Sequence, residues 1–304
     1  MEQNHMTESV MDRRQTVRNY IQENGGSQAA FARSIGVSES YISRWFAGKL
    51  DNDDGIDQKV DEFFKKTEER SKLASTEQLA FAPTAISSTI WNTLNYCRLQ
   101  RFIGCIVGDA GIGKTRTIHE WAAGKTDVYI VTATVVARNP KSFFKLLARK
   151  FQTTTTGTVD DIYFDLTQKI MGRDITLIID EAQHLKFDTL EQIRDLNDQY
   201  NVSIVLVGNP KINKTLSGKR KEDYAQITSR IKMPQTLLKD SFTLNDMTLI
   251  FPGLEDSSYK FLLHVAQRGS GLRDAMTVYI NSTNNNDISV TGLRAMASFM
   301  RISA

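Results

Sequence analysis

The sequence has no run of 18 consecutive apolar residues, and its N-terminus has no apolar segment of the kind that directs secretion. It therefore indicates neither a membrane span nor a secretion signal, and we expect a cytoplasmic protein. The 304 residues exceed what a single hydrophobic core usually holds, which predicts two or three domains. With 40% hydrophobic and 24% charged residues, the composition is that of an ordinary globular protein.

Cysteine and histidine are scarce. The two cysteines are Cys97 and Cys105, and Cys105 lies in a run that predicts a buried strand, which favours a packed thiol over a disulfide or a catalytic role. The four histidines lack the spacing of a metal site. A net charge of +3 is too small to indicate a partner by itself, so the distribution of charge has to be considered.

One octet fits the P-loop pattern GxxxxGK[ST] at every fixed position: Gly108, Asp109, Ala110, Gly111, Ile112, Gly113, Lys114 and Thr115. Glycines let the backbone turn tightly with its N–H groups toward phosphate oxygens, Lys114 adds a positive charge, and the Thr115 hydroxyl can reach Mg²⁺. The apolar run at 102–107 predicts a strand before the loop, and 116–123 predicts a helix after it. The sequence therefore predicts a site for ATP and Mg²⁺, with Arg116 among the nucleotide-binding candidates.

A second apolar run, 175–181, ends in two carboxylates, as a buried parallel strand does when it points at a ligand crevice. In this Walker B reading Asp180 holds Mg²⁺ through water, and Glu181 orients or deprotonates the attacking water. A third apolar run at 203–207 is followed by Asn209, whose amide can contact the water or the γ-phosphate as a sensor 1. For the acidic pair, two solvated acids at a strand end are the alternative.

Residues 28–46 resemble a helix-turn-helix of the phage-repressor type. Ala32 is small where two helices cross, Gly36 can adopt the left-handed turn, and Ser38 caps the second helix. We expect that helix to present polar side chains toward a DNA groove: Ser38, Ser40, Ser43 and Arg44. A helical pair used only for packing or protein contacts is the alternative. One module per chain requires a dimer or a filament for strong binding.

We predict four segments: a helix-turn-helix domain at 1–66, a linker at 67–83, an α/β core at 84–235 and a small helical lid at 236–304. Strands are expected near 102–107, 128–133, 175–180 and 203–207. Helices are expected at 261–266, 272–279 and 292–300. The fold class is an α/β AAA+ P-loop core, a parallel sheet flanked by helices, with an all-α N-terminal domain and an α-helical lid.

Two arginines and one basic segment are further candidates. Arg230 could act as an arginine finger in a neighbouring subunit, and Arg273, at the start of a predicted lid helix, could contact the γ-phosphate as a sensor 2. Either could equally be a surface arginine. Between Asn209 and Lys232, seven basic residues face two acidic ones, a net +5, and five of the basic residues are candidate phosphate contacts: Lys211, Lys214, Lys219, Arg220 and Lys221. A merely solvated basic loop is the alternative.

The order of these parts resembles the AAA+ target-selection ATPases of transposons, a family that includes the B proteins of Mu-like phages. The resemblance is carried by the helix-turn-helix at 28–46 and by five short motifs: GDAGIGKT at 108–115, LIIDEAQHL at 177–185, VLVGN at 205–209, TSRI at 228–231 and GSGLRDA at 269–275. Gln183 lies in the second motif, at a position that no chemistry known to us requires.

The resemblance implies an ATPase in the bacterial or phage-infected cytosol that binds double-stranded DNA with little sequence preference and forms helical filaments with ATP. It also implies that the filament delivers DNA to a DDE transposase and activates it. Hydrolysis promoted by the transposase is expected to disassemble the filament and so protect DNA near the element's own ends from insertion. Two other functions share these motifs: a replication initiator or helicase loader, and a helix-turn-helix transcription regulator switched by ATP.

Overall fold

The computed structural model describes residues 2–23, 26–50, 54–74, 79–217 and 228–303. The chain divides into two compact units, Met1–Gln78 and Leu79–Ala304. Among the described residues, none of the helices is long and apolar enough to cross a membrane.

The N-terminal unit consists of helices α1 (Glu2–Glu23), α2 (Gln28–Ser34), α3 (Glu39–Phe46) and α4 (Asp54–Ala74). The predicted helix-turn-helix is confirmed as α2 and α3. Gly36 has φ 66°, and the Ser38 hydroxyl accepts a hydrogen bond from the Tyr41 N–H at 3.2 Å. The indole N–H of buried Trp45 donates to Asp57 at 2.8 Å and so attaches α3 to α4.

Two features of this unit were not predicted. Helix α1 packs Val17 into the core and pairs Arg13 with Asp61 through two contacts, of 2.8 and 2.9 Å. Those contacts hold α1 against α4. The polar composition of residues 2–23 does not by itself predict a helix packed in this way. Helix α4 continues to Ala74, so the first part of the predicted linker at 67–83 is helical.

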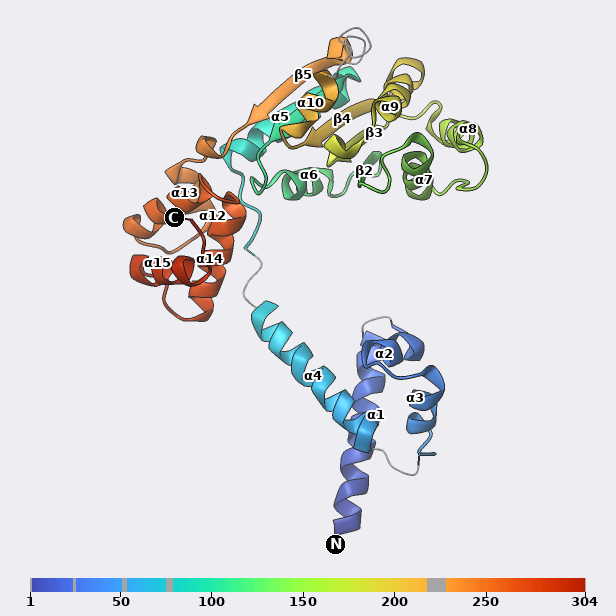
Figure 1. The fold of residues 1–304 in the computed structure, drawn as a ribbon, viewed down its shortest axis with the longest axis vertical. Coiled ribbons are helices and arrows are strands. Elements are labelled where there is room, and N and C mark those ends of the chain that lie inside the picture. The colour runs from blue at the N-terminus through green and yellow to red at the C-terminus, as the bar shows by residue number, and fades with distance from the viewer. Residues whose placement is uncertain (1, 24–25, 51–53, 75–78, 218–227, 304) are drawn as a thin grey trace. The chain divides into compact units, whose positions relative to one another are not determined.

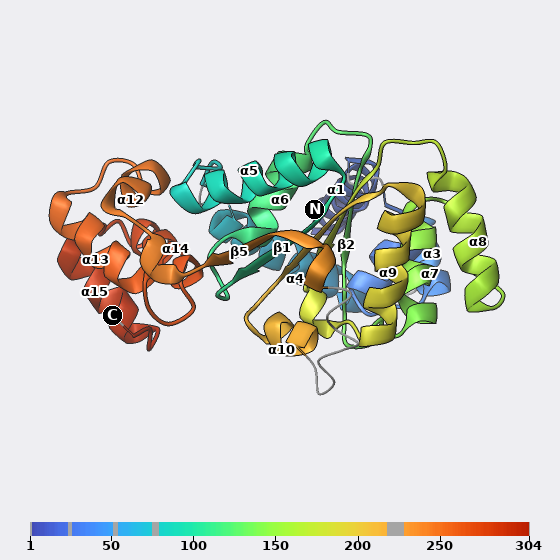
Figure 2. The same cartoon turned by 90° about the horizontal axis from the view of Figure 1, so that it is seen from above.

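The second unit is built on a five-stranded sheet in the order β2-β3-β4-β1-β5, in which every neighbouring pair is parallel. Figure 2 shows β5 beside β1. The expected strands are confirmed as β1 (Ile103–Gly108), β2 (Val128–Thr132), β3 (Thr176–Asp180) and β4 (Ser203–Gly208). Strand β5 (Ile231–Leu237) was missed. It contains Pro234 and alternating exposed residues, which fit only an edge strand, whereas the central strands β1, β3 and β4 are buried throughout.

Helices cover both faces of the sheet because alternate strand residues point to opposite sides. Ile103, Cys105 and Val107 face a core formed with α7 (Pro140–Lys150), α8 (Val159–Ile170) and α9 (Phe187–Tyr200). Ile106 faces the other core, formed with α5 (Ala85–Gln100), α6 (Lys114–Ala122) and the C-terminal helices. Helix α10 (Lys211–Ser217) follows β4. Both thiols are buried, which raises the pKa of Cys97 and of Cys105 to about 12.

The lid consists of α12 (Leu244–Ile250), α13 (Asp256–Ala266), α14 (Leu272–Asn284) and α15 (Val290–Phe299), which lie together at one end of the sheet (Figure 1). The three expected lid helices are confirmed in longer form, and α12 is additional. Asp246, 2% exposed, accepts hydrogen bonds from the N–H groups of Thr243 at 2.8 Å and Ala85 at 2.9 Å. The lid is thereby tied to the start of α5.

Candidate nucleotide site

The P-loop connects the end of β1 at Gly108 to the start of α6 at Lys114. Gly111 has φ 79° and Gly113 has φ 90°, conformations that L side chains rarely adopt. The loop ends directly at the N-terminus of α6, where unpaired N–H groups and the helix dipole favour an anion. The backbone geometry is therefore that of a phosphate-binding loop.

Lys114 lies back across this loop. Its ammonium donates to the carbonyl oxygens of Gly108 and Asp109, each at 2.8 Å. Burial lowers the pKa of Lys114, and the nearby carboxylates of Asp180, Glu181 and Asp109 oppose that effect. The positive charge thus stands at the mouth of the loop, next to the acidic end of β3.

Thr115 and Asp180 lie together although they are distant in sequence. The Thr115 hydroxyl donates to Oδ2 of Asp180 at 2.7 Å, and the Glu181 N–H donates to Oδ1 at 2.9 Å. Asp180 is 2% exposed. A hydroxyl and a buried carboxylate form an all-oxygen donor pair of the kind that Mg²⁺ binds, so these two residues fit that ion.

Glu181 follows β3 in a left-handed conformation with φ 56°, which turns the chain into a 3-10 helix at Ala182–His184. Its carboxylate is 45% exposed and accepts a hydrogen bond from the Gln183 side-chain amide. Nε2 of His184 lies 3.9 Å from the same oxygen, Oε2. The sequence alone does not reveal these contacts of Gln183, because they depend on the turn at Glu181.

Asn209 follows β4 and lies beside this group. Its backbone N–H donates to Oε1 of Gln183 at 3.2 Å, and its side-chain oxygen accepts from the Lys211 N–H at 2.9 Å, at the start of α10. The parallel pairing of β3 with β4 brings their carboxyl ends to one edge of the sheet. The predicted Walker B and sensor 1 residues are therefore neighbours in space.

The lid contacts the P-loop through backbone atoms. We call residues 269–271 the lid loop. A Cβ at Gly111 would collide with the Ser270 carbonyl of this loop, and the Arg273 N–H donates to the Gly111 carbonyl at 3.3 Å. Arg273 also stands close enough to Lys114 to lower its pKa further. The predicted sensor 2 residue thus lies next to the predicted phosphate loop.

Three further candidates for the nucleotide site contact protein groups in this structure. The Arg116 guanidinium donates to the Leu79 carbonyl, before α5. Asp109 accepts from the Lys239 N–H at 3.3 Å, where β5 leads into the lid. Arg230 is 55% exposed and pairs with Asp198 of α9 at 3.4 Å. The nucleotide contact of Arg116 and the finger role of Arg230 stay predictions.

The DNA candidates are only partly described. In the helix-turn-helix, Ser38, Ser40, Ser43 and Arg44 are exposed, as expected. Lys211 is exposed at the start of α10. The side chain of Lys214 lies outside the described residues, as do Lys219, Arg220 and Lys221.

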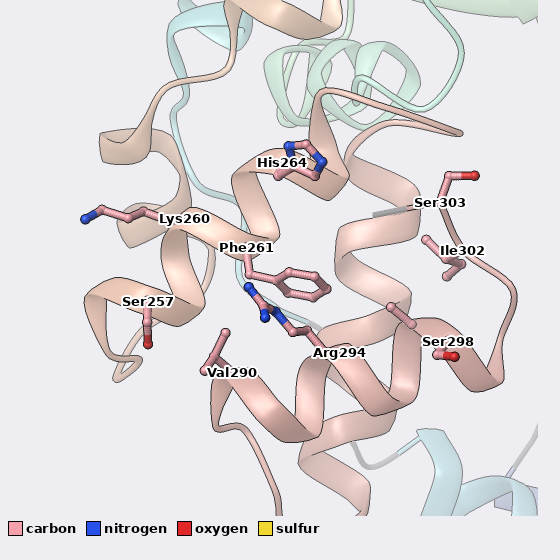
Figure 3. Close-up of a pocket in the computed structure, with 10 residues that line it drawn as sticks. Ser257, Lys260, Phe261, His264, Val290, Arg294, Ser298, Ile302 and Ser303 are labelled. Carbon is pink, nitrogen blue, oxygen red and sulfur yellow. The ribbon is translucent and has the colours of Figure 1, made fainter.

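A separate depression lies on the lid, lined by α13, α15 and the last residues of the chain (Figure 3). Lys260, His264 and Arg294 give it a basic character, and Arg294 stands 5.8 Å from the centre of the Phe261 ring. No residue of the P-loop or of the Walker B strand lines it. It is therefore not the nucleotide site.

Comparison with known sequences agrees with this geometry. A model of the AAA domain matches residues 98–216, and a helix-turn-helix model matches residues 17–51. The chain is 26% identical to the Mu-like prophage FluMu DNA transposition protein B of Haemophilus influenzae, over 86% of this chain and 93% of that protein. It is 24% identical to the ATP-dependent target DNA activator B of Escherichia phage Mu (MuB), over 73% of this chain and 72% of that protein.

Among solved structures, a chain of Drosophila ORC bound to DNA has a TM-score of 0.51 at 13% identity, over 77% of this chain and 67% of that chain. That likeness shows a shared fold. With B proteins aligned over most of its length and an AAA domain around its P-loop, the chain is a MuB-like AAA+ ATPase.

Proposed function

We propose that ATP binds with its phosphates in the loop at 108–115 and is hydrolysed there with Mg²⁺. The observation that carries the proposal is the convergence of Lys114, Thr115, Asp180 and Glu181 at the carboxyl edge of the sheet, joined by the 2.7 Å contact between Thr115 and Asp180. Acidic groups beside a phosphate loop are otherwise unfavourable, because they repel the ligand; a divalent cation between them removes that conflict.

Each residue then has a defined task. The Lys114 ammonium, which now binds two carbonyl oxygens, transfers to the β- and γ-phosphates. Thr115 and Asp180 hold Mg²⁺, which neutralises phosphate charge when bound. Glu181, exposed enough to meet water, orients the attacking water and accepts its proton.

Three residues report on the γ-phosphate in this proposal. Asn209 acts as sensor 1 from the end of β4, and Arg273 acts as sensor 2 from the lid of the same chain. Arg230 acts as a finger in the site of the neighbouring subunit. For that task it has to leave Asp198, and an ion pair whose arginine is 55% exposed is weak enough to exchange.

We further propose that the ATP-bound protein forms filaments on double-stranded DNA with little sequence preference and delivers that DNA to a DDE transposase, which it activates. Support comes from the relatives named transposition protein B and target DNA activator B, from the helix-turn-helix, and from the net +5 between Asn209 and Lys232. A filament repeats each basic segment once per subunit, so weak phosphate contacts add up.

Electron microscopy of the purified protein with random-sequence DNA tests this proposal. We expect filaments with ATP and none with ADP or without nucleotide. Binding confined to one operator would favour the transcription regulator, and action that requires a helicase would favour the loader. A protein that neither binds ATP nor assembles on DNA would overturn the proposal.

A further inference from the structure

One side chain joins the two strand ends that carry the proposed base and sensor. Gln183 donates from its amide nitrogen to Oε2 of Glu181, and its amide oxygen accepts from the Asn209 N–H at 3.2 Å. The first partner follows β3, and the second follows β4. We call this pair of hydrogen bonds the amide bridge.

The surrounding backbone is shaped to admit the amide bridge. Glu181 adopts its left-handed conformation and starts a tight 3-10 turn, which brings the Gln183 side chain back toward the Glu181 carboxylate. On the other strand, a Cβ at Gly208 would lie 2.5 Å from Oε1 of Gln183. Glycine at position 208 therefore leaves the space that the amide occupies.

We propose that Gln183 is a positioning residue, which holds the carboxylate of Glu181 in register with the end of β4 at Asn209. The inference rests on the proposed ATPase function and adds a residue to it. Without such a contact, a glutamate side chain that is 45% exposed samples several rotamers. Its carboxylate would then seldom be oriented to accept a proton from the attacking water.

The amide bridge holds one oxygen of Glu181 and leaves the other for a water molecule. Within the described part of the chain, Oε1 of Glu181 has no hydrogen-bond donor, whereas Oε2 has the Gln183 amide and, at 3.9 Å, His184. Because the other end of the amide bridge is a backbone N–H, movement of the β4 end on contact with the γ-phosphate shifts Glu181 as well.

The first test replaces Gln183 by Met, which keeps its length and removes both hydrogen bonds. Full-length protein with saturating random-sequence DNA should show kcat about tenfold lower, with KM for ATP and the affinity for a fluorescent ATP analogue within about twofold of wild type. Gln183→Glu should lose at least as much, because it keeps the acceptor for Asn209 but places a second carboxylate beside Glu181. Gln168→Met, on the exposed face of α8, is the matched control.

The second test perturbs the amide bridge from the opposite strand. Gly208→Ala should lower kcat about as much as Gln183→Ala, and the double variant should be no slower than the slower single variant, because both changes act on one contact. Circular dichroism of each variant checks that the protein is folded.

Three outcomes would overturn the inference: an unchanged kcat in Gln183→Met, a rise in KM matching the fall in kcat/KM, or multiplicative losses in the double variant. These three outcomes can be distinguished from a failure of the proposed ATPase function, because each requires a wild-type protein that hydrolyses ATP. If the wild-type protein itself hydrolyses no ATP, the ATPase proposal falls, and the inference falls with it.

Discussion

The Thr115 hydroxyl and the Asp180 carboxylate, 65 positions apart in the chain, meet at 2.7 Å on the carboxyl edge of the sheet. The contact fixes the first turn of α6 against the end of β3, so the phosphate loop and the acidic strand end form one rigid group.

Lys114→Ala should abolish nucleotide-dependent DNA binding, because it removes the ammonium that offsets the β- and γ-phosphate charge at the loop. Titration with a fluorescent ATP analogue measures the loss, and Lys150→Ala, at the exposed end of α7, is the control. Equal ATP affinity in the Lys114 variant would show that the loop does not bind phosphate in this way.

Glu181→Gln should still bind ATP and remain on DNA, since the amide keeps the shape and its carbonyl can still accept from Gln183. Hydrolysis should fall by about a hundredfold or more, as it does when a general base is removed. Phosphate release measured beside DNA retention separates the two effects. Turnover near the wild-type rate would mean that another group takes the proton.

Arg230→Ala should leave ATP binding by the monomer intact and lower DNA-stimulated hydrolysis by about a thousandfold, the scale of an arginine finger. The loss of its 3.4 Å pair with Asp198 should have little effect on stability, because the Arg230 side chain is 55% exposed and Asp198 keeps its pair with Arg194. Asp198→Asn breaks the same pair, together with the 3.6 Å pair between Asp198 and Arg194, but keeps the Arg230 guanidinium, so it is the control and should retain turnover.

The same prediction has a mixing test. Arg230→Ala and Glu181→Gln subunits, each inactive alone, should regain part of the activity when assembled together, because one supplies the finger and the other the base. Absence of recovery at every mixing ratio would contradict a finger that acts between subunits.

Neutralising Lys219, Arg220 and Lys221 together should weaken binding to all DNA sequences and flatten the dependence of log affinity on log salt by up to about one unit per lost contact. Deleting residues 1–76 should weaken binding but leave ATP-dependent filaments. Fluorescence anisotropy at several salt concentrations measures both. If the deletion abolishes binding and the triple variant binds normally, the helix-turn-helix is the DNA site.

Gly104→Ala should destabilise the core by about 1–3 kcal/mol, because its new Cβ would collide with the buried Sγ of Cys97. Urea denaturation measures the change in the free energy of unfolding. Adding Cys97→Ala makes room, so the double variant should lose less than the sum of the two single losses. Additive losses would mean that the collision is relieved elsewhere.

The features that could be predicted from the sequence are those set by residues close together in the chain. The P-loop, the apolar runs of β1, β3 and β4, and the turn at Gly36 are local patterns whose chemistry allows few other structures. Strand β5 was not predicted, because Pro234 and the alternating exposure of its residues suit only an edge strand. Which strand lies at the edge depends on the order of the whole sheet, which the local sequence does not determine. The role of Gln183 was not predicted for two reasons. Its contact with Glu181 depends on the left-handed turn at that residue, and its other partner, Asn209, lies 26 positions away in the sequence.

The contact between Gly111 and the lid loop has a mechanical consequence. It joins backbone to backbone, since the Ser270 carbonyl packs on Gly111 and the Arg273 N–H reaches the Gly111 carbonyl at 3.3 Å, so no change of rotamer can absorb a displacement. A shift of the phosphate loop would therefore be passed directly to the first turn of α14. Because α13 and α15 pack against α14, the lid and the phosphate loop are mechanically coupled through the backbone of two residues, Gly111 and Arg273.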